Sequence, residues 1–207
     1  MILRFLLASL WICPASWAAP QTSAPSGISH EIKSADAFKQ ASELLAAGSL
    51  DQAVVLAKQG LAHSPRSVAG LNLLGVIYNQ QRKYQEAVVQ FQQALTIAPN
   101  SVDTLVNLGT SLAAQNKNDL SEQSLKKALR LQPGNKTTNY NLGTVLLSQK
   151  KPKESLFYLK RIPSPDQSTR LLVIQAYLDA GMQAAGNAAA EKLSQDVAKD
   201  PRIHFSL

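Results

Sequence analysis

Apolar and small residues recur along this chain at a constant spacing of 34 residues. A leucine–glycine pair returns three times at that spacing, and a proline follows the same step. The positions are Leu74, Leu108 and Leu142, then Gly75, Gly109 and Gly143, then Pro65, Pro99 and Pro133. Small residues form two more columns, which are Ala53, Ala87, Ser121 and Ser155, and Gly60, Ala94 and Ala128. One period shared by several independent columns predicts an array of repeated structural units.

The unit 68–101 carries the fullest set of these positions. They are Leu71, Leu74, Gly75, Tyr78, Tyr84, Ala87, Phe91, Ala94 and Pro99. This pattern resembles the tetratricopeptide repeat (TPR), a family whose unit is a helix–turn–helix. The resemblance implies an all-α fold, a TPR superhelical solenoid of antiparallel helix pairs with about four to five repeats. It also implies a concave groove lined by the first helix of each pair.

The pattern divides the chain into four TPR units over residues 34–167 and a degenerate fifth unit, or capping helices, over 168–201. The first unit has Ala41 and Ala57 in place of the usual glycine and aromatic residue, and the fourth ends early at Pro163 and Pro165. Leu171, Ile174 and Leu178 mark one helical face of the fifth unit, and residues 202–207 read as the start of a further helix or a frayed tail.

The glycine and proline columns have direct physical explanations. A glycine in the middle of a helix costs ~1 kcal/mol relative to alanine, so Gly75, Gly109 and Gly143 predict that a neighbouring helix approaches closely there. Proline disfavours helix in the residue before it, so each column proline predicts the end of a second helix. A single unit cannot bury its apolar face alone, and stacking of units would create the core.

The first helices would place a set of polar and small residues in the groove. The candidate ligand-binding residues are Asn72, Val76, Asn79, Asn107, Thr110, Tyr140, Asn141 and Thr144. An amide offers both a donor and an acceptor, so asparagines could pair with the backbone of an extended peptide. The alternative is that these asparagines only cap helices and solvate a polar groove. The carboxylate clamp of chaperone-binding TPR proteins is not expected, because Asp103 and Asn107 occupy positions where it needs basic residues.

The N-terminus has the pattern of a secretory signal over residues 1–18. Arg4 gives a positive start, an apolar stretch follows, and Ser16 and Ala18 are small residues suited to cleavage after Ala18. An uncleaved membrane anchor is the alternative, although the apolar run is shorter than the ~20 residues of a spanning helix. Residues 19–33 read as a disordered lead-in. The protein is therefore expected to be exported, and periplasmic or secreted.

Composition narrows the classes of function. Cys13 is the only cysteine and lies in the signal segment, so the mature chain would lack thiol nucleophiles and cysteine metal ligands. The three histidines show no metal-binding spacing, and no phosphate-binding loop or nucleophile elbow occurs. Neither an enzyme, a cofactor nor a metal site is expected. The formal net charge is +7, but only 17% of residues are charged and nucleic acid is not an expected partner.

Basic residues gather near the end of the fourth unit, where they either form a solvated surface or meet an acidic partner or anionic envelope surface. They are Lys150, Lys151, Lys153, Lys160 and Arg161. At the C-terminus Ile203, Phe205 and Leu207 are apolar, which suggests self-association or docking at that end. The sequence thus predicts an exported scaffold that binds a protein or extended peptide in its groove. The alternative is an accessory subunit, or a truncated fragment, of a larger enzyme or envelope-assembly protein.

Overall fold

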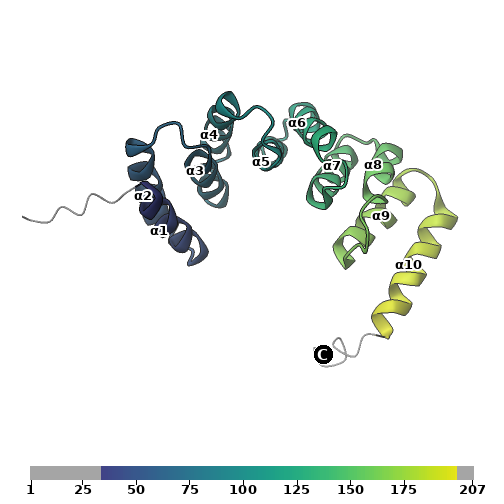
Figure 1. Ribbon diagram of the computed structural model, residues 1–207. Coiled ribbons are helices and arrows are strands. Elements are labelled where there is room, and N and C mark those ends of the chain that lie inside the picture. The colour runs from purple at the N-terminus through teal and green to yellow at the C-terminus, as the bar shows by residue number, and fades with distance from the viewer. Residues whose placement is uncertain (1–33, 200–207) are drawn as a thin grey trace, which may run out of the picture. The chain divides into compact units, whose positions relative to one another are not determined.

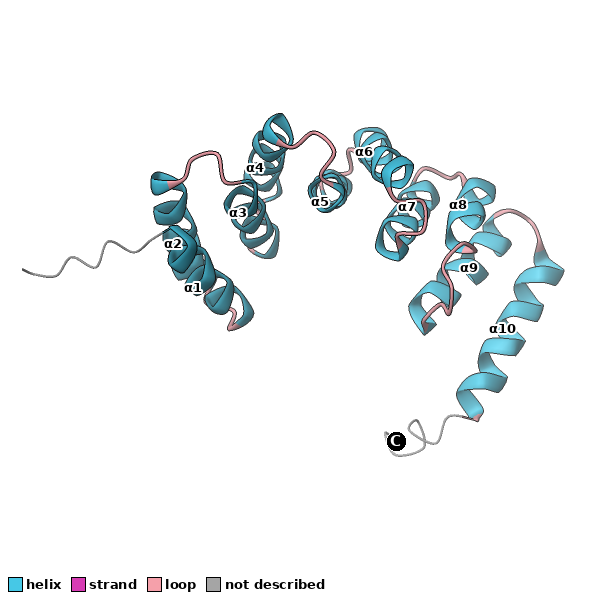
Figure 2. Ribbon diagram, viewed as in Figure 1, coloured by secondary structure: helices cyan, strands magenta, loops and turns pink. Residues whose placement is uncertain are grey.

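The computed structural model describes residues 34–199, which form ten α-helices and, within that range, no β-strand (Figures 1 and 2). The helices are α1 (Ser34–Ala46), α2 (Leu50–His63), α3 (Val68–Gln80), α4 (Tyr84–Ile97), α5 (Val102–Ala114), α6 (Asn118–Leu131), α7 (Lys136–Ser148), α8 (Pro152–Leu159), α9 (Gln167–Asp179) and α10 (Gln183–Ala198). The predicted signal segment 1–18, the lead-in 19–33 and the tail 202–207 lie outside the described residues.

The helices pack in chain order as five consecutive pairs. Each helix contacts the next one along the chain, and the first helices α1, α3, α5, α7 and α9 also contact one another in sequence. The second helices make no such contacts with each other among residues 34–199. The prediction of an all-α solenoid of helix pairs is confirmed. We call the side formed by α1, α3, α5, α7 and α9 the first-helix face.

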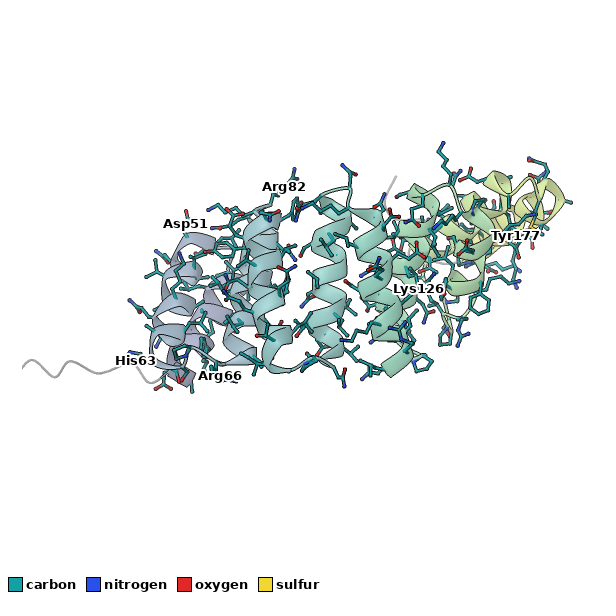
Figure 3. All side chains as sticks on the ribbon, turned by 90° about the horizontal axis from the view of Figure 1, so that it is seen from above. Asp51, His63, Arg66, Arg82, Lys126 and Tyr177 are labelled. Atoms are coloured by element: carbon teal, nitrogen blue, oxygen red, sulfur yellow. The ribbon has the colours of Figure 1, made fainter. Side chains whose placement is uncertain are left out.

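Capping side chains fix where the first helices begin. Ser67 Oγ accepts a hydrogen bond from the Gly70 N–H (3.1 Å), and Asn135 Oδ1 accepts one from the Thr138 N–H (2.9 Å). These bonds satisfy backbone donors that have no partner inside the helix. The turns within pairs follow one edge of the array, where Arg82 is labelled, and the turns between pairs follow the opposite edge, near Arg66 (Figure 3).

The glycine column lies where second helices press against first helices. A Cβ atom built on Gly75 would be 2.5 Å from Phe91 Cε1, and one on Gly109 would be 2.7 Å from Leu125 Cγ. Gly143 has the same relation to Leu159, at 2.5 Å from Cδ2. Phe91, Leu125 and Leu159 are almost fully buried. The missing side chains of the glycines are thus replaced by core residues of the paired helix.

The fifth pair differs from the others. Leu171 and Leu178, two of the three residues predicted to mark one face of this unit, are 51% and 37% exposed. Only Thr169 and Ala176 are buried on α9. Helix α8 is also short, with 8 residues, and it is followed by the proline-rich segment around Pro163 and Pro165. The apolar core therefore thins toward α10.

Candidate functional site

The predicted groove residues all lie on α3, α5 and α7, on or near the first-helix face. Asn72, Val76 and Asn79 belong to α3, and Asn107 and Thr110 belong to α5. The remaining three, Tyr140, Asn141 and Thr144, belong to α7. Thr110 and Thr144 are exposed, and the other six are half-buried. None of the eight is enclosed in the core, so each has surface available on this part of the molecule.

Hydrogen bonds between neighbouring first helices engage several of the asparagines. Asn72 Nδ2 donates to Thr104 Oγ1 (2.8 Å), which joins α3 to α5. Further along the same two helices, Ser111 Oγ donates to Asn79 Oδ1 (2.8 Å). Such bonds fix side chains that would otherwise be free to rotate, and they hold the repeats in register. The asparagines of α3 therefore have a structural role in addition to any contact with a ligand.

Asn107 and Asn141 share one repeat position but differ in their bonding. Asn141 Nδ2 donates to Thr110 Oγ1 of α5 (3.1 Å). The Asn107 side chain makes no hydrogen bond to any other residue in the range 34–199, although it is half-buried. Its amide therefore keeps both donor and acceptor capacity for a ligand. A regular ladder of equivalent, unpaired asparagines is not present in the described residues.

A hollow of about 150 Å³ opens between α5 and α7, and we call it the α5–α7 hollow. Four of the eight predicted residues line it: Thr110, Tyr140, Asn141 and Thr144. The other lining residues are Gly109, Ala113, Ser121, Leu125 and Val145. Ser121 Oγ donates to the Gly109 carbonyl (2.7 Å), so its polar atom is already satisfied. The hollow thus has an apolar interior with polar groups beside it, a combination typical of ligand pockets.

The side chain that packs against the glycine differs between the helix pairs. In the pair α3–α4 the aromatic ring of Phe91 fills the space against Gly75. The equivalent residue against Gly109 is Leu125, which has a smaller side chain. The sequence contained this difference in the column Phe91, Leu125 and Leu159. Sequence reasoning found the polar surroundings and missed Leu125, Ala113 and Val145, because the depth of a hollow depends on packing.

Within the described residues, neither a metal site nor a membrane-spanning helix accompanies this hollow. Among residues 34–199 no group of three or more histidine, aspartate or glutamate side chains is placed to hold a metal ion. None of the helices in the same range is both long and apolar enough to cross a bilayer.

Comparisons with known proteins agree with the helical architecture. The family model described as tetratricopeptide repeat matches residues 38–102 and 106–168. No curated protein sequence matches the chain. Among solved structures, MamA is similar with a TM-score of 0.75 and 17% identity over 85% of this chain and 98% of that chain. PilF of Pseudomonas aeruginosa has a TM-score of 0.70 and 22% identity, over 78% of this chain and 75% of its own.

A third similar structure is YrrB, described as a TPR protein with an unusual peptide-binding site. Its TM-score is 0.67 with 18% identity, and the match covers 84% of this chain and 91% of that one. At these identities the structural similarities establish the fold alone.

Proposed function

This chain belongs to the tetratricopeptide-repeat family, and on that premise we propose that it binds an extended segment of a partner protein across α3, α5 and α7. The α5–α7 hollow carries the proposal. Its volume of about 150 Å³ suits one side chain rather than a whole small molecule, since typical ligand pockets measure roughly 300–1,000 Å³. A peptide laid over the first-helix face would insert one apolar side chain there.

Polar groups beside the hollow would hold the backbone of such a peptide. Thr110 and Thr144 are exposed, and although their hydroxyls donate to the Val106 and Tyr140 carbonyls, each oxygen keeps acceptor capacity for a backbone N–H. Asn107, on α5 but outside the lining of the hollow, has an amide with free donor and acceptor capacity. These groups bind backbone N–H and C=O groups without regard to sequence. The peptide-binding site named for YrrB supports this use of a TPR array. The specificity of the complex would then come from the side chain in the hollow.

The second part of the proposal is export. It rests on the signal pattern of residues 1–18, with cleavage after Ala18. The scaffold would then work in the periplasm or outside the cell. Expression of the full chain in a bacterial host, followed by fractionation and N-terminal sequencing, tests this. A mature chain that begins near Ala19 is the expected result, and retention of Met1 in the exported fraction would overturn it.

The binding test uses the chain without its signal segment. Peptides that bind it are first selected from a displayed peptide library. The variant Leu125→Phe should fill the hollow as Phe91 fills the space at Gly75, and affinity should fall about tenfold or more if a side chain is excluded. Leu159→Phe is the matched control, because Leu159 occupies the same repeat position and packs against Gly143, away from the hollow. Isothermal calorimetry gives the affinities, and circular dichroism verifies folding.

Equal affinity for the Leu125→Phe variant and the wild type would place the peptide elsewhere. A second variant, with both Asn107 and Asn141 changed to alanine, addresses the backbone contacts. It should remain folded and bind more weakly, because neither side chain is fully buried.

A further inference from the structure

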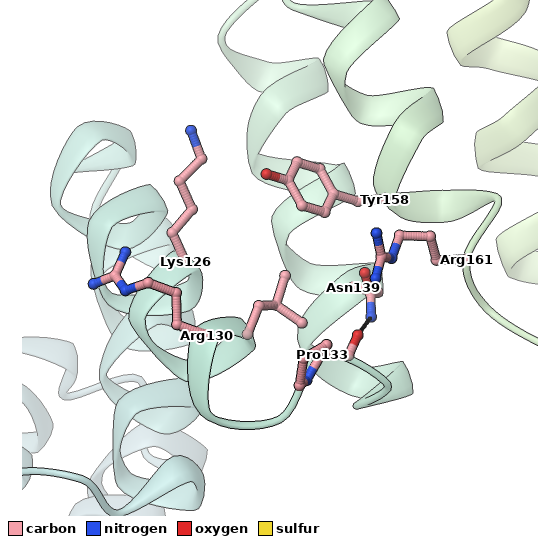
Figure 4. Close-up of a pocket in the computed structure, with 7 residues that line it drawn as sticks. Lys126, Arg130, Pro133, Asn139, Tyr158 and Arg161 are labelled. Carbon is pink, nitrogen blue, oxygen red and sulfur yellow. Dashed lines mark hydrogen bonds between the residues drawn. The ribbon is translucent and has the colours of Figure 1, made fainter.

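A second cleft lies on the other side of α7, between the second helices α6 and α8 (Figure 4). Its volume is about 280 Å³, and we call it the α6–α8 cleft. The residues that line it are Lys126, Leu129, Arg130, Pro133, Asn139, Tyr158 and Arg161. Leu129, Pro133 and the Tyr158 ring give it apolar walls, while three cationic side chains surround it. None of these residues belongs to the α5–α7 hollow.

Asn139 is the unusual residue of this cleft. It occupies the repeat position that holds Leu71 and Leu105 in the preceding units, and it is only 1% exposed. Its Nδ2 donates to the backbone carbonyls of Pro133 (3.2 Å) and Asn135 (2.9 Å). These two bonds fix the orientation of the amide, because the flipped form would set Oδ1 against two acceptors. Oδ1 is buried and has no hydrogen-bond partner within residues 34–199.

A buried acceptor without a donor is unfavourable, by roughly 1–3 kcal/mol. The leucines at the equivalent positions show that the fold does not need an amide here. The asparagine therefore supplies an acceptor that the core does not use.

The preceding unit shows what the cleft residues do where no asparagine is present. There Lys127 Nζ donates to the Pro99 carbonyl at 2.7 Å. Arg161 occupies the position equivalent to Lys127, but Asn139 already binds the Pro133 carbonyl. The Arg161 guanidinium instead lies over the Phe157 ring, 5.3 Å from its centroid. Its donors are thus left available at the cleft.

Of the three cationic side chains around the cleft, one is paired with a carboxylate of the described residues and two are not. Lys126 pairs with Glu122, which also accepts a hydrogen bond from Lys151 (3.1 Å). The hydrogen bond from Lys126 holds the pKa of the Glu122 carboxyl below its usual value, so this pair stays ionised at neutral pH. Arg130 and Arg161 are exposed and form no ion pair with any residue of the described range. The two arginines therefore give the cleft a net positive charge.

We propose that the α6–α8 cleft binds a carboxylate of a partner polypeptide together with the backbone N–H next to it. Arg161, whose guanidinium lies beside Asn139, binds the carboxylate, since a guanidinium group matches its geometry, and Arg130 adds positive charge on the α6 side of the cleft (Figure 4). The peptide N–H next to the carboxylate donates to Asn139 Oδ1. An apolar side chain of the bound polypeptide packs on Leu129, Pro133 and Tyr158. A fully ionised anion without a donor would satisfy the arginines and leave Oδ1 unpaired. The carboxylate belongs either to a chain terminus or to an aspartate or glutamate.

Three pools of fluorescein-labelled random hexapeptides test the proposal by fluorescence anisotropy. The first pool lacks Asp and Glu and ends in a free carboxylate, the second has the same sequences with a C-terminal amide, and the third is amidated but contains one Asp or Glu. Binding of the first pool identifies a chain terminus, and binding of the third identifies an acidic side chain. The second pool should bind at least tenfold more weakly than whichever pool binds.

Two variants separate the cleft from general attraction to a basic surface. Arg161→Gln and Asn139→Leu should each weaken binding roughly tenfold, because the first removes a hydrogen bond that involves a charged group and the second leaves the peptide N–H without an acceptor. Lys127→Gln removes the same charge at the equivalent position of the preceding unit and should leave affinity unchanged. Leu125→Phe should also have no effect, so failure of the groove proposal remains distinguishable from failure here.

The proposal is overturned if the second pool, which has no carboxylate, binds as tightly as the first and the third, or if Lys127→Gln weakens binding as much as Arg161→Gln does. It is equally overturned if neither carboxylate pool binds while inorganic phosphate does, as seen by line broadening of Arg161 resonances in NMR spectra. Because the Arg161 side chain is exposed, its glutamine variant is expected to fold even if Asn139→Leu does not.

Discussion

At the scale of single residues, the turn within each helix pair requires a left-handed backbone. Gly48, Arg82, Asn116 and Lys150 lie 34 residues apart, with φ values of 76°, 59°, 59° and 60°. Glycine adopts this conformation without steric cost, whereas other L-residues lose ~1–2 kcal/mol. Arg82 and Lys150 therefore store strain that the helix packing on both sides must overcome, whereas asparagine adopts this conformation more readily. The turn of the fifth pair again has a glycine, Gly181, with a φ of 73°.

Lys150→Gly is expected to stabilise the protein by about 1 kcal/mol, because it removes that strain and only part of the gain is offset by the greater freedom of glycine in the unfolded chain. Urea unfolding followed by circular dichroism measures the change. Lys153→Gly is the matched control. Lys153 lies in the first turn of α8 at an exposed position, where glycine relieves no strain, so the same substitution should destabilise by up to about 1 kcal/mol. Stabilisation by both variants would exclude turn strain as the cause.

Gly109→Leu is expected to destabilise the fold by about 1–3 kcal/mol through overpacking. A Cβ at this position would be 2.7 Å from Leu125 Cγ and 2.9 Å from Cδ2, so the leucine must move before any larger side chain fits. Gly134→Leu serves as the control, since nothing lies within 4 Å of a Cβ built there. The midpoint of urea unfolding should fall for Gly109→Leu only. Equal midpoints for the two variants would contradict the close helix contact.

At the scale of elements, the first helix of the fifth pair is held at its start by a titratable cap. Asp166 Oδ1 accepts hydrogen bonds from the Thr169 N–H (2.8 Å) and the Ser168 hydroxyl (3.0 Å). Hydrogen bonds from the Thr169 side chain and backbone, and then from Ser168, hold the pKa of the Asp166 carboxyl below its usual value. The other first helices with a side-chain cap, α3, α5 and α7, use serine or asparagine, which do not titrate.

The lowered pKa of Asp166 predicts acid sensitivity of the start of α9. A depressed folded-state pKa gives stability that is complete above the unfolded pKa of about 3.9 and is lost as the pH falls through the folded value. Asp166→Asn keeps a capping side chain and removes the titration. Thermal unfolding of both proteins between pH 7 and pH 2 should show the wild type losing its advantage over the variant only at the acid end. Parallel curves over the whole range would contradict a role for the carboxylate.

The sequence predicted the features of the elements that depend on repeated small and apolar residues, and not those that depend on packing against neighbouring helices. The 34-residue columns predict the helices and their pairing, because both repeat with that period. They also predict the tight contacts at Gly75, Gly109 and Gly143, because a close approach of two helices needs a small residue. The left-handed conformation of Arg82 and Lys150 could not be predicted from their own side chains. Asn139 was visible as an asparagine in a leucine column, but its burial and its unpaired oxygen depend on α6 and α8.

For the candidate site, the sequence predicted where residues lie but not how their polar atoms are bonded. Thr110, Tyr140, Asn141 and Thr144 were placed together from repeat register, and the structure brings all four to the α5–α7 hollow. The sequence left open whether the asparagines contact a ligand or only cap and solvate the groove, and in the structure Asn72, Asn79 and Asn141 hydrogen-bond to neighbouring first helices. Register fixes which face a residue occupies. It does not fix which of its polar atoms a neighbour has already used.

At the scale of the whole described array, stability should vary along the chain. Each pair is buried mainly by its neighbours, so a terminal pair has fewer stabilising contacts than a central one. Helix α5 buries seven residues, including Leu105, Leu108 and Leu112. Helix α10 buries only Gly186 and Leu193, and within residues 34–199 it packs against α9 alone. The short helix α8 gives the fifth pair a small surface on which to dock.

Native-state hydrogen exchange should therefore show a gradient, with α5 and α6 exchanging slowest and α10 fastest. Exchange reports the free energy of the local opening that exposes each amide, and a terminal pair can open without unfolding the centre. Mass spectrometry of peptic fragments at neutral pH measures the protection of each helix. The Gly109→Leu variant adds an internal test, because damage in the centre should speed exchange in α5 and α6 and leave α10 nearly unchanged. Equal protection of α10 and α5 in the wild type would mean that the described residues unfold as one cooperative unit, and that something beyond the contacts of α9 holds the last helix in place.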